Sequence, residues 1–134
     1  MLNGSIPSAA YDTACTSHAE MVEDPFIQTN KPSTKIFALA DGHATAGSNV
    51  EKLHHNVREP ARTVDMVPAF KENSLLSGGN FSQAGYVTVC DDKKMSLYEI
   101  KTAKITVSEE AVLTRWRCPT SNMWRIPLVK ICHN

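Results

Sequence analysis

The sequence has no long apolar run. None of its stretches approaches the roughly 20 apolar residues that a helix needs to cross a bilayer. The first residues lack the basic region and apolar core of a secretory signal, so we expect a cytoplasmic protein with no membrane partner. Residues 1–8 are mostly small and polar with one proline, and we expect them to form a tail.

The chain also has no excess of charge of either sign. Its 14 basic residues balance 14 acidic ones among 134 residues. This balance gives no electrostatic reason to expect nucleic acid as a partner. Hydrophobic residues make up 42% of the chain, which is ordinary for a folded protein and argues against disorder throughout. The length suits one domain with a core of its own.

The sequence also lacks closely spaced pairs of metal ligands. The four cysteines are Cys15, Cys90, Cys118 and Cys132. They are widely spaced and form no CxxC pair, so we expect free thiols and no zinc site. His54 and His55 are adjacent, and on a strand they would point to opposite faces, so we interpret them as two surface histidines. We expect no metal and no organic cofactor.

Short segments with strand-like composition fill the chain, and their regular spacing predicts an all-β domain. We expect strands at residues 35–39, 50–57, 62–67, 74–77, 86–90, 95–100, 104–107, 111–116 and 124–128. Asp41-Gly42 predicts a hairpin turn whose returning arm is 50–57. The proline-containing stretch 24–33 predicts a loop, and Asn80 to Ala84 predicts a short helix that Gly85 ends.

The segment that is the best candidate for a chemically active site begins at Asp12. This acid ends a short apolar strand, and the hydroxyl groups of Thr13 and Thr16 follow it as donors that could hold its carboxylate. From composition alone, an Asp before Thr is more often a turn or helix cap. A nucleophile formed by Cys15 and His18 is a further alternative, but we favour a buried cysteine beside a surface histidine.

The order of motifs along the chain resembles the aspartic protease domain of copia-type retrotransposon polyproteins, a retropepsin. The family's active-site strand, Asp-Ser/Thr-Gly-Ala-Thr, is similar to residues 12–16, which read Asp-Thr-Ala-Cys-Thr. The flap strand with its Asp-Gly tip resembles residues 37–42. The signature Val-x-x-Val-Pro-x-x-x-x-Asn-Leu-Leu-Ser resembles residues 64–77, with Ser74 inserted before the leucine pair. The ending at 116–128 is similar to the segment that follows the protease in such polyproteins.

This resemblance implies a closed β-barrel with a flap hairpin and one short helix, followed by extra short strands. Residues 9–90 would form the protease domain, and 91–134 a C-terminal β extension that belongs to the same unit or begins the next polyprotein segment. Asp12 would be catalytic, supported by Thr13, Ala14 and Thr16, with Asp41 and Gly42 at the flap tip. Because one chain supplies one Asp, a homodimer would cut a polypeptide substrate.

Ala14 departs from the family pattern, which has glycine at this position. If the backbone there has a positive φ, we expect the methyl group to strain the turn beneath the carboxylate. The alternative function follows from this departure: a catalytically inactive retropepsin-like module that dimerises or binds peptides without cutting them.

Overall fold

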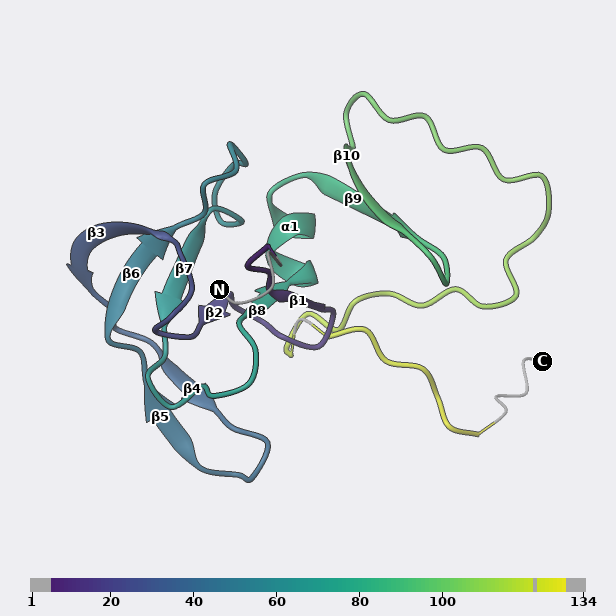
Figure 1. Ribbon diagram of the computed structural model, residues 1–134. Helices are drawn as coiled ribbons and strands as arrows, with labels where there is room; N and C mark the ends of the chain where they lie inside the picture. Colours follow the sequence, from purple (N-terminus) through teal and green to yellow (C-terminus); the bar gives the residue numbers. More distant parts are fainter. Residues whose placement is uncertain (1–5, 122, 130–134) are drawn as a thin grey trace.

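A computed structural model describes residues 6–121 and 123–129 (Figure 1). The described chain contains short strands and one helix, in the order β1 (Ala10–Asp12), β2 (Ala19–Glu20), β3 (Ile27–Pro32), β4 (Ile36–Ala38), β5 (Ala44–Ala46), β6 (Asn49–Lys52), β7 (Thr63–Met66), β8 (Leu75–Ser77), α1 (Gly78–Gln83), β9 (Tyr86–Cys90) and β10 (Met95–Glu99). The predicted mostly-β class with one short helix is confirmed.

The main sheet has six strands in the order β1-β8-β2-β7-β6-β3. Its outer strands, β1 and β3, do not pair with each other, so within the described residues the sheet stays open and the predicted closed barrel is wrong. The remaining strands form the separate hairpins β4–β5 and β9–β10. Both hairpins project away from the main sheet in Figure 1.

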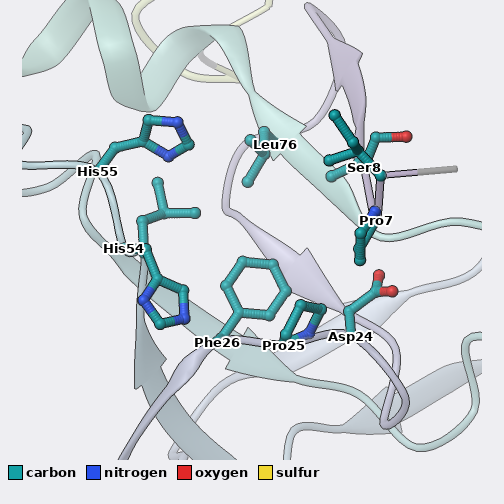
Figure 2. A pocket seen from close by; sticks show the side chains of 11 residues that line it. Pro7, Ser8, Asp24, Pro25, Phe26, His54, His55 and Leu76 are labelled. Carbon is teal, nitrogen blue, oxygen red and sulfur yellow. The ribbon is translucent and has the colours of Figure 1, made fainter. Parts of the chain in front are cut away.

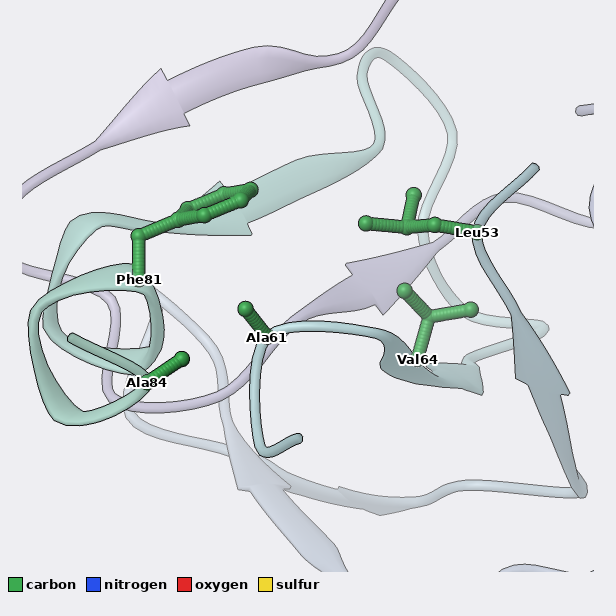
Figure 3. Packing of buried hydrophobic residues seen from close by; sticks show 5 residues of the cluster. All are labelled: Leu53, Ala61, Val64, Phe81 and Ala84. Carbon is green, nitrogen blue, oxygen red and sulfur yellow. The ribbon is translucent and has the colours of Figure 1, made fainter. Parts of the chain in front are cut away.

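The apolar core lies between the main sheet and α1. It is built from Leu53, Ala61, Val64, Phe81 and Ala84, which face one another in Figure 3. The helix begins directly after β8, and Gly85 ends it with a φ of 92°, which a glycine adopts without strain. The predicted role of Gly85 is therefore confirmed, although the helix begins two residues earlier than Asn80.

The predicted loop at 24–33 is wrong, because it contains β3. Its proline is tolerated since β3 is an edge strand, where one side makes no ladder hydrogen bonds. The register with β6 shifts between Gln28 and Lys31, and Asn30 between them has a φ of 62°. Asparagine adopts this left-handed conformation more readily than most residues, which allows the bulge.

The hairpin at Asp41-Gly42 forms as predicted, but its returning arm is β5 and not residues 50–57. The turn closes at once, since the Leu39 N–H donates to the carbonyl of His43 at 2.8 Å. β6, which holds part of the predicted arm, pairs instead with β3 and β7 in the main sheet.

The chain beyond β10 has no regular structure in residues 100–121 and 123–129. The strands predicted at 104–107, 111–116 and 124–128 are therefore wrong, whereas the one at 95–100 is confirmed as β10. A strand needs a neighbour to satisfy its backbone groups, and this segment runs largely over open space (Figure 1). Its large apolar side chains are exposed, including Trp116 at 89%.

Candidate functional site

Asp12 is the last residue of β1, where the strand runs parallel to β8 and Asp12 lies opposite Ser77. Its side chain is half-buried. The backbone N–H of Ala14 donates to its Oδ1 at 2.8 Å, which closes a short turn around the carboxylate. The strand end and this turn together present a carboxylate with a defined orientation to solvent.

The predicted supporting residues lie on the loop that follows, here called the Asp12 loop (residues 12–18). Thr13, Ala14 and Thr16 are all exposed. Among non-glycine residues that the structure describes, only Asn30 has a positive φ, so the strain expected at Ala14 is absent. The backbone of Ala14, rather than either threonine hydroxyl, makes the hydrogen bond to Asp12 that the structure shows.

The Asp12 loop is held in place by Ser77 and His18, and both are fully buried. The Ser77 hydroxyl donates to the carbonyl of Cys15 at 2.5 Å, and the Ser77 N–H donates to Nδ1 of His18 at 2.7 Å. Because Nδ1 accepts, the ring proton lies on Nε2, which donates to the carbonyl of Ala61 at 2.7 Å. These bonds tie the middle of the loop, at Cys15, and its last residue, His18, to the core.

This arrangement excludes a nucleophile pair of Cys15 and His18. Burial lowers the pKa of His18 to about 4, and both its ring nitrogens are engaged, so it is not a free base. Burial raises the pKa of the Cys15 thiol, which donates to the carbonyl of Ser17 at 2.7 Å. Cys15 is half-buried, so the prediction of a buried cysteine is only partly correct, and the prediction that His18 lies on the surface is wrong.

The hairpin of β4 and β5 is the candidate flap (residues 36–46). Gly42 at its tip has a φ of 88°, and a side chain there would meet no atom within 4 Å. The His43 N–H donates to Oδ1 of Asp41 at 2.9 Å, and this bond helps to lower the pKa of the carboxyl group of Asp41. Asp41 and Gly42 are both exposed. An exposed tip on a two-stranded hairpin has few contacts to hold it, as expected of an element that moves.

A pocket of about 420 Å³ lies between the segment before β1, the turn at 24–26 and the bend at 53–55, with Leu76 of β8 also in its lining (Figure 2). It is lined mainly by apolar side chains, with Asp24, His54 and His55 among its polar members. Asp12 is not part of the lining. The two histidines are surface residues as predicted, although they lie in a bend and not on a strand. Over the described ranges, no three His, Cys, Asp or Glu side chains are grouped to hold a metal ion. Cys132 lies outside them.

The main sheet contains three buried acidic residues that no sequence motif predicted: Glu20, Glu51 and Asp65. Glu20 and Glu51 lie on one face, where burial and the neighbouring Glu51 raise the pKa of Glu20 to about 9. At neutral pH Glu20 is therefore a neutral acid beside Glu51. Asp65 lies on the opposite face, since successive residues of a strand alternate and Asp65 is paired with Ala19.

No family model matches this chain, and no curated protein or solved structure matches it either. The candidate site therefore rests on its own geometry and on the sequence motifs. In the part of the chain that the structure describes, no helix has the length and apolar character that crossing a membrane requires.

Proposed function

We propose that this chain is one subunit of a homodimeric aspartic endopeptidase, similar to the retropepsins of copia-type retrotransposon polyproteins. The observation that carries the proposal is the Asp12 carboxylate at the end of β1, oriented by the Ala14 N–H at 2.8 Å. Ser77 and His18 hold the surrounding loop to the core, so the carboxylate has the firm support that a catalytic group needs.

The proposed chemistry needs two copies of Asp12, one from each chain across a two-fold axis. Two carboxylates held close together cannot both ionise, so they share one proton. The ionised group takes a proton from a water molecule, whose oxygen attacks the peptide carbonyl. The protonated group donates a hydrogen bond to that carbonyl and later supplies the proton that the leaving amine requires. The substrate is a polypeptide, and no cofactor takes part.

Two further features support the proposal. The candidate flap is a two-stranded hairpin with an exposed tip at Asp41-Gly42, a form suited to covering an extended substrate. The β9–β10 hairpin pairs with no third strand among the described residues and exposes apolar side chains such as Val89 at 46%. An unpaired apolar hairpin of this kind is suited to contact a second subunit.

Cleavage of an unfolded polypeptide, measured across protein concentration, tests the proposal. We expect specific activity to rise with concentration as chains associate, and a pepstatin-type inhibitor to abolish it. Sedimentation velocity on the same samples should show the monomer–dimer equilibrium. A dimer that binds peptide but releases no new termini would support the inactive module instead. A monomer at all concentrations would overturn the homodimeric endopeptidase, and a monomer that also binds no peptide would overturn the inactive module too.

A further inference from the structure

The candidate flap and the Asp12 loop are joined by one side chain, that of Lys35. Its Nζ lies 3.4 Å from Oδ2 of Asp65 on β7. The same Nζ donates to Oγ of Ser17, at the far end of the Asp12 loop, at 3.2 Å. Lys35 itself immediately precedes β4. A side chain from the base of the hairpin therefore contacts both the main sheet and the loop of the candidate catalytic residue through one ammonium group.

Asp65 is the fixed point of this network, because only 2% of its side chain is exposed. The hydroxyl of Ser33, two residues before Lys35, donates to its Oδ1 at 2.6 Å. A buried carboxylate is costly unless it is paired and hydrogen-bonded, and both partners come from the segment that leads into β4. Asp65 therefore fixes where the hairpin leaves the main sheet.

Gly47, at the other end of the hairpin, leaves the space that this network needs. A side chain at Gly47 would place its Cβ 2.5 Å from Oγ of Ser33, which would displace the hydroxyl from Asp65. The Gly47 N–H donates to the carbonyl of Lys35 at 3.0 Å and closes the base of the hairpin. Both arms of the candidate flap therefore meet at the residues that contact Asp65.

We propose that Lys35 is a positioning residue that couples the candidate flap to the Asp12 loop, acting through Asp65 and Ser17. The proposal rests on the proposed function for its catalytic meaning. The structural part of the proposal does not depend on catalysis: the ammonium group of Lys35 sets the position of the hairpin relative to the Asp12 loop. Its loss frees the hairpin from the loop while the main sheet remains intact.

Amide hydrogen exchange on the full chain tests the coupling directly. In Lys35→Met, which keeps most of the aliphatic stem, we expect the amides of Leu39 and Gly47 to exchange about fivefold faster. The amide of Leu53, which donates to the carbonyl of Arg62 just beyond the paired ends of β6 and β7, should be unchanged. The matched control is Lys31→Met, the same change at an exposed lysine of β3, which should leave all three amides unaffected.

Restoration by a conservative change separates positioning from simple destabilisation. Lys35→Arg keeps the charge and should return exchange at Leu39 to within about twofold of the parent chain. Unchanged exchange at Leu39 and Gly47 in Lys35→Met would overturn the proposal. Equal acceleration at Leu53 would also overturn it, because Lys35 would then act on global stability alone.

A kinetic measurement connects the coupling to catalysis. If the parent chain cleaves peptides, Lys35→Met should lower kcat about tenfold with a smaller change in KM, because misplaced elements mainly affect alignment of the reacting groups. Lys35→Arg should restore kcat. Parent activity with kcat unchanged in Lys35→Met would overturn the catalytic role of Lys35 and leave the proposed function standing. Absence of cleavage by the parent would overturn the proposed function, and the exchange rates alone would then decide the coupling.

Discussion

The backbone nitrogen of Ser77 lies 2.7 Å from Nδ1 of the buried His18. This contact joins the residue before α1 to the last residue of the Asp12 loop, and it needs a neutral imidazole, because a protonated ring has no acceptor. The position of the candidate catalytic loop is thus linked to the protonation state of one histidine.

The pH dependence of stability follows from this link. The pKa of His18 falls from its ordinary 6.5 to about 4, chiefly through burial. Between these two pH values His18 is protonated in the unfolded chain but neutral in the folded chain. The free energy of unfolding therefore decreases as pH falls from about 6.5 towards 4. This difference in the pKa of His18 lowers the free energy of unfolding by about 3 kcal/mol at most. In urea unfolding at pH 7.5 and 5, His18→Gln should be less stable than the parent at pH 7.5 but lose less on acidification. An equal loss in both proteins would contradict this.

Glu20 predicts the opposite pH dependence. Its pKa is raised from 4.5 to about 9, so the folded state favours the proton and stability declines as pH rises through this interval. Glu20→Gln keeps the shape, stays neutral and can donate to Glu51. We expect it to raise the free energy of unfolding at pH 8 by about 1–3 kcal/mol, with little gain at pH 4.5. Glu23→Gln, at an exposed position, is the control and should change neither value.

Ala14→Gly tests whether the departure from the family motif matters. Because Ala14 has no positive φ and its N–H already reaches Asp12, glycine should relieve no strain. We expect a stability loss of about 0.5–1 kcal/mol from the greater freedom of the unfolded chain, with any cleavage rate unchanged within about twofold. A large rise in cleavage rate, or a gain in stability, would show that the methyl group is strained after all.

The β9–β10 hairpin predicts where subunits meet. Val87, Val89 and Tyr98 lie on the face turned away from Thr88, whose hydroxyl is within 2.6 Å of Tyr11. Val89→Asp should weaken self-association about tenfold or more in sedimentation velocity, because it places a charge on an apolar contact surface. Thr102→Asp adds the same charge at an exposed turn and serves as the control. Equal association of both variants would place the interface elsewhere.

Local features of the fold were predictable from the sequence. The β-branched run at 86–90 predicted β9, Gly85 predicted the end of α1, and Asp41-Gly42 predicted the hairpin turn. These signals depend on a few neighbouring residues and their backbone preferences. Within the candidate site, the position of Asp12 at a strand end and the contact from the Ala14 N–H follow from the same local chemistry.

Features that depend on distant partners were not predictable. β3 forms in spite of Pro32 because β6 supplies a partner on one side. The C-terminal apolar segments stay irregular because no strand of the described chain pairs with them. His18 is buried by contacts with Ser77 and Ala61, which lie 59 and 43 residues away. The role of Lys35 likewise depends on its contact with Asp65, 30 positions further along the chain. The periodicity of the sequence does not indicate which distant residues contact each other.

The most direct test of the account is a mixing experiment with Asp12→Asn. Subunits of the parent and the variant are combined at equal amounts, allowed to exchange, and assayed for peptide cleavage at constant total concentration. If two Asp12 carboxylates form one site, only parent homodimers cut, and activity falls to about one quarter of the unmixed parent at the same total concentration. The variant alone should be inactive yet folded. Activity at about one half would mean that each chain acts alone, and full activity of the variant would remove Asp12 from the mechanism.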